Sequence, residues 1–162
     1  ATISSLKTNP ELLSILINPF ALCDGVEGIQ QKDDSKVKYD EDLQTWIAPF
    51  FMAPINTKNI HRTNKLMNHI YGKDFLYNEM WVQGPGEEGK AAAEYISSIN
   101  PLGNAPEPGE GPSRDKREKG SYDILIYTKV DNHVFKVSVS GDMDPGYGST
   151  SKMIFELSLI HI

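Results

Sequence analysis

The chain has 162 residues, of which 39% are hydrophobic and 23% are charged, which suits one globular domain with a hydrophobic core. A net charge of −6, with no basic stripe carrying interleaved aromatic residues, argues against nucleic-acid binding. Cys23 is the single cysteine, which excludes an intrachain disulfide framework and favours a reducing, cytoplasmic compartment. No apolar run reaches the ~20 residues of a membrane-spanning helix.

The first predicted helix begins at Asn9 and Pro10, an N-cap residue followed by proline at the first helical position, and ends before Pro19. Residues 23–41 are polar with few large apolar side chains, so we expect an exposed, mobile loop. Residues 46–55, WIAPFFMAPI, are dense in apolar groups and prolines. They are interpreted as core in preference to the wall of a pocket.

A second helix is predicted over residues 54–71, with Gly72 as its C-terminal stop. Its expected apolar face consists of Ile60, Met67, Ile70 and Tyr71. The polar residues of this helix form either a hydrogen-bonding surface or a solvated face. His61 and His69 are eight residues apart with no further ligand at metal-binding spacing, so no metal site is expected.

A strand is predicted over residues 75–82, followed by Gly84-Pro-Gly-Glu-Glu-Gly89 and a helix. This segment has the literal G-x-G-x-x-G spacing of a dinucleotide-binding turn. However, Glu87 and Glu88 would repel a pyrophosphate, and the acidic residue needed ~20 positions later would fall in the Pro/Gly-rich segment 104–112. The sequence therefore predicts no nucleotide site on this chain.

Residues 100–112 are predicted to be a flexible loop, and residues 113–119 one or two helical turns. Residues 121–130 and 133–140 alternate in hydrophobicity around Asp131-Asn132, which predicts a hairpin with Phe135, Val137 and Val139 facing inward. Together with strand 75–82 this indicates an α+β fold, a largely antiparallel sheet with helices packed on one face.

The likeliest ligand site is residues 141–152, GDMDPGYGSTSK, where the second hairpin strand leads into an apolar helix. Ser149 or Thr150 would cap this helix and leave N–H groups able to hold a carboxylate or phosphate. Asp142 and Asp144 either occupy those donors or accept from a hydroxyl, an amide or a nicotinamide. A plain strand-to-helix turn with self-capping aspartates is an equal alternative.

Several of these segments together resemble the saccharopine dehydrogenase-like oxidoreductases, and the nearest group includes the bacterial trans-acting enoyl reductases. The resemblance covers the whole chain. The matching motifs are W-x-A-P-F-x-M-A-x-I-N-T at 46–57, R-x-N at 62–64, Y-G at 71–72, G-E-G-P-S at 109–113 and G-D-x-D-P-G-Y-G at 141–148. Met143 stands where family members commonly carry arginine.

In that family, an N-terminal Rossmann domain binds NAD(P) and precedes the portion matched here. The resemblance implies that residues 1–162 are the α+β domain that follows it, forming the substrate side and supporting dimerisation. It also implies that NAD(P) is bound mainly by the missing domain, and that this chain by itself holds no cofactor and is inactive. The expected partners are the protein's own Rossmann domain and a small-molecule, acyl or lipid-like substrate.

The expected reaction reduces a carbonyl or enoyl group, with Tyr147 as proton donor and Lys152 or Arg62 as the electrostatic partner of an oxygen. Asn56 and Asn64 would orient the substrate. The candidate substrate-binding residues are Asn56, Arg62, Asn64, Asp142, Asp144, Gly146, Gly148 and Thr150. The structural alternatives are a Tyr147 ring packed over its turn and solvated charges at Arg62 and Lys152.

Two non-catalytic alternatives stay open. Residues 46–55 could take an acyl chain in a lipid-binding or scaffold module, or an exposed sheet edge could pair two copies into a homodimer. The expected location is cytoplasmic, with lipid or membrane association of the full-length protein left open.

Overall fold

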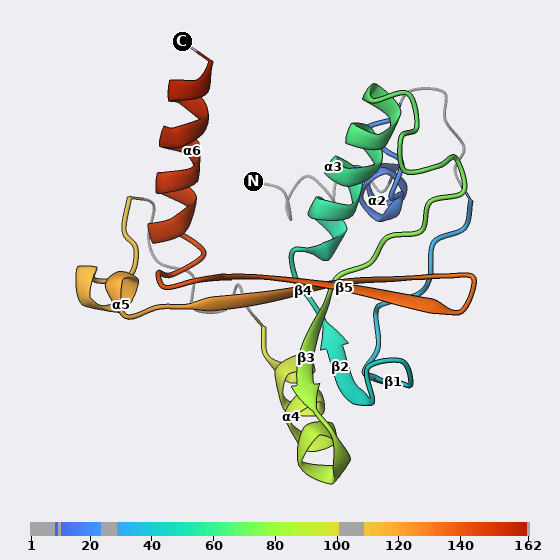
Figure 1. The fold of residues 1–162 in the computed structure, drawn as a ribbon, viewed down its shortest axis with the longest axis horizontal. Coiled ribbons are helices and arrows are strands. Elements are labelled where there is room, and N and C mark those ends of the chain that lie inside the picture. Colours follow the sequence, from blue (N-terminus) through green and yellow to red (C-terminus); the bar gives the residue numbers. More distant parts are fainter. Residues whose placement is uncertain (1–8, 10, 24–28, 101–108, 162) are drawn as a thin grey trace. The chain divides into compact units, whose positions relative to one another are not determined.

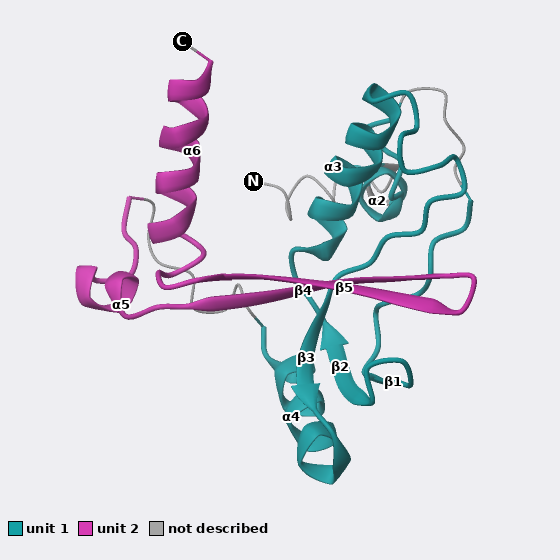
Figure 2. Cartoon of the chain, viewed as in Figure 1, with its two compact units in different colours: residues 1–103 teal, residues 104–162 magenta. Residues whose placement is uncertain are grey.

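The computed structural model describes the chain except residues 1–8, 10, 24–28, 101–108 and 162. It divides into two compact units, residues 1–103 and residues 104–162, which Figure 2 colours separately. Each unit combines helices with an antiparallel sheet, so the predicted α+β class is confirmed.

The elements of each unit are labelled in Figure 1. The first unit contains α2 (Glu11–Ile17), β1 (Lys38–Asp40), β2 (Thr45–Pro49), α3 (Ala53–Leu66), β3 (Met80–Gly84) and α4 (Gly86–Ser98). The second unit contains α5 (Arg114–Glu118), β4 (Tyr122–Val130), β5 (His133–Gly141) and α6 (Gly148–Ile160).

The core of the first unit lies where α4 packs against a three-stranded antiparallel sheet of order β1-β2-β3. Ile47 and Ala48 of the central strand are buried, and so is Ala93 of α4. This confirms the core interpretation for the start of residues 46–55, although the strand itself was not predicted. Phe51 and Ile55, further along that stretch, are exposed.

The loop prediction for residues 23–41 is wrong at its C-terminal end, because β1 pairs with β2 there. Residues 24–28 lie outside the described part. Gln31, which precedes β1, binds the chain that leads into β3. Its side-chain amide donates to the Phe75 carbonyl (3.4 Å) and accepts from the Tyr77 N–H (3.0 Å). Backbone and amide pairing thus holds a segment that has few apolar side chains.

Helix α3 ends at Leu66, five residues before the predicted end, and its buried residues are His61 and Asn64 instead of the expected apolar face. The hydrogen bonds of Asn64 explain both the early end of α3 and the exposure of the expected apolar residues. Its side chain donates to the Gly72 carbonyl (2.8 Å) and accepts from the Tyr71 N–H (2.9 Å), so the chain folds back after the helix. Met67, Ile70 and Tyr71 consequently lie on an exposed turn.

The predicted single sheet is also wrong, because β3 begins at Met80 and pairs with β2, whereas β4 and β5 form a sheet of their own. The hairpin itself is confirmed: Ile124 faces Val139 and Ile126 faces Val137. Asp131 and Asn132 supply the two positive φ angles, 47° and 67°, of a two-residue turn.

The expectation that Phe135, Val137 and Val139 face inward is wrong, because their exposed fractions are 58%, 60% and 46%. Strand alternation places them on one face, as predicted, but a two-stranded hairpin has no second layer of its own to bury that face. No helix among the described residues is long and apolar enough to cross a membrane.

Candidate functional site

The turn between β5 and α6 is held by close packing at glycines. A Cβ at Gly120 would lie 2.5 Å from the Asp144 nitrogen, and a Cβ at Gly141 would overlap the Tyr122 ring. The Asp144 N–H donates to the Arg117 carbonyl (2.9 Å), which ties the turn to α5. Residues of α5, the turn and the start of α6 therefore form one packed arrangement.

Asp144 caps α6 with its carboxylate. Its oxygens accept hydrogen bonds from the N–H groups of Gly148 (2.8 Å), Tyr147 (2.7 Å) and Gly146 (3.3 Å). These bonds, led by that of Gly148 and assisted by the Arg117 charge, lower the pKa of Asp144 from its usual value. The self-capping alternative is confirmed for Asp144, whose carboxylate occupies the N–H groups of Gly146, Tyr147 and Gly148.

The prediction that Ser149 or Thr150 caps the helix is wrong, because the N-cap residue is Tyr147 and both residues lie inside α6. The Ser149 hydroxyl donates to the Met143 carbonyl (3.4 Å) and the Thr150 hydroxyl to the Pro145 carbonyl (2.6 Å). Both side chains therefore tighten the turn that precedes the helix.

Tyr147 lies with its ring over Gly111, whose Cβ, if present, would be 3.2 Å from the ring. Its side chain is partly open to solvent, because the residue is 48% exposed. Its hydroxyl makes no hydrogen bond to any residue that the structure describes. The ring is thus packed, as the structural alternative expected, while the hydroxyl is available to a ligand.

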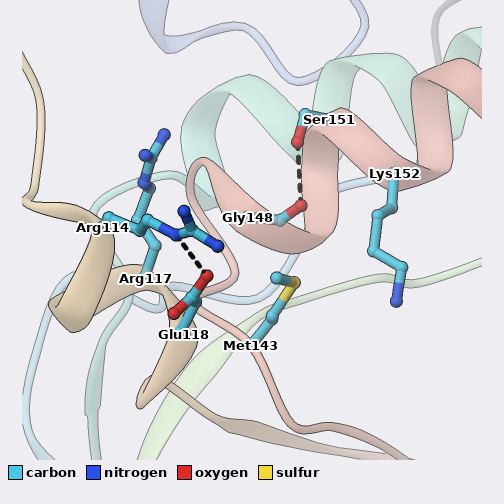
Figure 3. Close-up of a pocket in the computed structure, with 7 residues that line it drawn as sticks. All are labelled: Arg114, Arg117, Glu118, Met143, Gly148, Ser151 and Lys152. Atoms are coloured by element: carbon cyan, nitrogen blue, oxygen red, sulfur yellow. Dashed lines mark hydrogen bonds and ion pairs between the residues drawn. The ribbon is translucent and has the colours of Figure 1, made fainter.

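A pocket of about 370 Å³ lies between α5 and the start of α6 (Figure 3). Its lining residues are Arg114, Arg117, Glu118, Met143, Gly148, Ser151 and Lys152. The Arg114 guanidinium donates to the Glu118 carboxylate at 2.6 Å. Gly148 and Lys152 were candidate site residues from the sequence. The two arginines were missed, because residues 113–119 were read only as charged helical turns.

The candidate residues of the first unit are engaged by that unit. The Asn56 amide donates to Glu79 (2.8 Å), the Arg62 guanidinium donates to the Leu22 carbonyl (2.7 Å), and Asn64 holds the turn after α3. Their substrate-binding roles stay predictions. Asp142 is exposed and makes no hydrogen bond within the described chain.

The Gly84–Gly89 turn does follow a strand and open a helix, but its residues do not fit a dinucleotide. The strand belongs to an antiparallel sheet, and Glu87 and Glu88 lie in the first turn of α4, where a pyrophosphate needs positive potential. Across the described residues there is no group of three or more His, Cys, Asp or Glu placed to hold a metal ion.

Comparison with known proteins gives relatives named as trans-acting enoyl reductases. A Mycobacterium tuberculosis (strain H37Rv) protein named "Putative trans-acting enoyl reductase" is 35% identical over 134 residues, covering 70% of this chain and 32% of that protein. A trans-acting enoyl reductase of Mycobacterium ulcerans is 24% identical, and the match covers 94% of this chain and 43% of that protein. One of Mycobacterium bovis is 27% identical, and the match covers 70% of this chain and 32% of that protein. No protein-family model and no solved structure matches.

The chain is thus similar to proteins named trans-acting enoyl reductase, as the resemblance predicted. It spans only about a third to two-fifths of the length of these relatives. The wider resemblance to saccharopine dehydrogenase-like enzymes stays a prediction.

Proposed function

We propose that this chain is the substrate-side part of an NAD(P)-dependent oxidoreductase that reduces an enoyl group. The supporting observation is the 35% identity to a protein named as an enoyl reductase. In such a reaction a bound nicotinamide supplies the hydride. We place its site outside this chain, because the glycine turn at Gly84–Gly89 does not fit it. An unsaturated acyl compound is the proposed substrate.

Tyr147 is the proposed proton donor. Addition of a hydride to the β-carbon of an enoyl group leaves an enolate, whose α-carbon takes a proton to give the saturated product. The Tyr147 hydroxyl has no protein partner among the described residues and is partly open to solvent, so it can deliver that proton and regain one from water. Lys152, which lines the neighbouring pocket, is the proposed cation for a substrate oxygen.

Replacing Tyr147 with phenylalanine in the full-length protein tests this role. We expect kcat to fall by about 100-fold or more with little change in KM, because positioned proton transfer contributes on that scale. The packing of the ring over Gly111 is retained, so folding is unaffected. Tyr95→Phe on α4, also an exposed tyrosine, is the matched control and leaves turnover unchanged. Unchanged turnover in Tyr147→Phe would remove the proton-donor role.

A structural role is the second candidate, favoured by the exposed apolar face of the β4–β5 hairpin. That face could pack against the protein's own cofactor domain or against a second copy. Sedimentation of the full-length protein tests the second possibility: a monomer at high concentration contradicts the homodimer.

A further inference from the structure

The outer edge of β5 is exposed along almost its whole length. β4 and β5 form a sheet of two strands (Figure 1), so within the described part of the chain no third strand pairs with either of them. Every residue of β5 from His133 to Ser140 is exposed. A strand edge of this kind presents a row of backbone N–H and C=O groups with which another strand can pair.

The turn of the hairpin determines which backbone groups of β5 point outward. Val130 and His133 close a two-residue turn as a hydrogen-bonded pair, and hydrogen-bonded and non-hydrogen-bonded pairs alternate along an antiparallel ladder. The odd-numbered residues of β5 therefore bond to β4. The even-numbered residues direct their N–H and C=O groups to the open edge, and these residues are Val134, Lys136, Ser138 and Ser140.

The sheet of the first unit has protected edges, whereas β5 does not. β1 has only three residues, and β3 has five and shifts its register with β2 beside Trp46. Short strands and irregular pairing both hinder the addition of a further strand. β5 has nine residues, a regular register and no proline. Of the usual protective features it has one lysine, Lys136.

We propose that β5 pairs with β5 of a second copy of this chain, antiparallel and centred on Val137. Val137 is the middle residue of the strand, so this register pairs the whole strand. Phe135 then faces Val139 of the second copy, and Lys136 faces Ser138 of the second copy. The two-fold axis is perpendicular to the sheet, so the apolar faces of both hairpins lie on the same side of one four-stranded sheet. Four strands overcome the marginal stability of an isolated hairpin.

The pattern of side chains on β5 is complementary to itself in this register. On the apolar face, Val137 meets its own copy between two pairs of Phe135 with Val139, and aromatic side chains opposite β-branched ones stabilise a sheet. On the other face, Lys136 lies opposite a serine. A register shift of two residues in one direction sets the two Lys136 ammonium groups opposite each other, where they repel. The same shift in the other direction leaves Phe135 opposite Gly141, without a side-chain partner.

This inference names the contact by which the second candidate function, a homodimer, would form, and it does not depend on the chemistry at Tyr147. Unchanged turnover in Tyr147→Phe would leave the pairing of β5 standing. Failure of the pairing would leave the proton-donor role standing.

Cysteine cross-linking of the full-length protein tests the register. As a non-hydrogen-bonded pair, the two Val137 Cα atoms would lie about 4.5 Å apart, within the range that a disulfide bridges. We expect Val137→Cys to give a covalent dimer on a non-reducing gel after mild oxidation with copper phenanthroline. The native Cys23 is buried.

Val139→Cys, on the same face of the same strand, is the matched control. Position 139 faces position 135 of the second copy, so two cysteines at position 139 are too far apart to bridge. This variant should give no more covalent dimer than the unaltered protein. Absence of a cross-link in Val137→Cys, or equal cross-linking in Val139→Cys, overturns the proposal.

An exchange of two side chains tests the contact of Lys136 with Ser138. Ser138→Lys sets ammonium groups opposite each other at two symmetric positions, and we expect it to weaken dimerisation by about tenfold, measured by sedimentation equilibrium. The double variant Lys136→Ser/Ser138→Lys again has a lysine opposite a serine and should restore the affinity. A dimer that Ser138→Lys leaves unchanged is held by another surface, which overturns the pairing of β5 but not the homodimer. A monomer at high concentration overturns both.

Discussion

Two glycine-rich turns in this chain lead from a strand into a helix, and they are built by different means. Between β3 and α4 the backbone packs on itself: a Cβ at Gly89 would overlap the Gly84 carbonyl, and the N-cap Pro85 provides no side-chain hydrogen bond. Between β5 and α6 one carboxylate, that of Asp144, accepts three amide hydrogen bonds. Both turns need glycines at close contacts, but only the second adds a side-chain cap, the carboxylate of Asp144.

The two turns also differ in the charges that surround them. Glu87 and Glu88 lie in the first turn of α4, where they interact favourably with the positive helix end and leave no attraction for another anion. At α6 the Asp144 carboxylate is engaged in capping, and Arg114, Arg117 and Lys152 line the same pocket as Glu118. A glycine pattern therefore indicates a tight turn, while the neighbouring charges decide whether an anion can bind there.

Replacing Gly89 with alanine should have the largest effect, and it separates the two construction principles. Helix propensity alone predicts stabilisation by about 1 kcal/mol, because alanine replaces glycine inside a helix. The Cβ, however, would overlap the Gly84 backbone, which cannot move aside like a flexible side chain. We expect the free energy of unfolding of the first unit to fall by about 3 kcal/mol, measured by urea denaturation.

Two other glycines serve as controls for Gly89→Ala. At Gly86 nothing lies within 4 Å of an added Cβ, but φ is +67°, so Gly86→Ala should cost only about 1–2 kcal/mol of backbone strain. At Gly148 an added Cβ meets the flexible Met143 side chain at 3.4 Å, and the cost should be within about 0.5 kcal/mol. Equal losses at all three positions would contradict the backbone-contact explanation.

Removing the Asp144 carboxylate tests the other turn and should have a smaller effect, confined to the start of α6. Because hydrogen bonding lowers the pKa of Asp144 below 3.8, its contribution to stability is complete above that pH and is lost as the pH falls through the folded-state pKa. By NMR, the amide protons of Tyr147 and Gly148 should keep their capped chemical shifts through the pH range in which an ordinary aspartate takes up its proton, and lose them only as the pH falls further, through the lowered pKa of Asp144.

In Asp144→Ala those amide protons should have uncapped shifts at every pH. Asp144→Asn keeps one acceptor oxygen and should be intermediate and independent of pH. Asp142→Ala is the matched control, since Asp142 makes no hydrogen bond within the described residues, and it should change neither shift. A titration in Asp144→Ala identical to that of the unaltered chain would assign the effect to another carboxyl group.

The elements whose signal is local were predictable from the sequence. Alternation around Asp131-Asn132 gave the β4–β5 hairpin in its correct register, because side-chain period and turn chemistry both act within neighbouring residues. The pairing of β1 and β2 was not predictable in the same way. Lys38–Asp40 has no apolar pattern, and its strand exists because the backbone of β2 offers it partners.

The candidate site shows the same limit. The G-D-x-D-P-G-Y-G segment marked the turn, and the capping role of Asp144 was one of the two interpretations that the sequence allowed. The arginines of α5 could not be assigned to it, because α5 meets the turn through the contact of Gly120 with Asp144, across more than twenty residues. The burial of His61 and Asn64 on α3 was likewise set by tertiary packing, against their polar character.

The smallest predicted effect concerns a cation beside the first turn. The Lys90 ammonium lies 5.6 Å from the ring centre of Trp46, whose backbone pairs with Gly84, and it forms no ion pair within the described chain. Lys90 thus has an aromatic partner, whereas Lys152 lines an open pocket. We expect Lys90→Gln to lower the free energy of unfolding by about 0.5–1 kcal/mol, and Lys90→Arg to retain stability.

A double-mutant cycle with Trp46→Leu isolates this interaction from other effects of each substitution. In the Trp46→Leu background, Lys90→Gln should cost almost nothing, so that the coupling energy equals the loss seen in the unaltered chain. Equal costs in both backgrounds would mean that the indole does not hold Lys90. That cation would then be as available to an anion as Lys152, and the contrast between the two turns would rest on Glu87 and Glu88 alone.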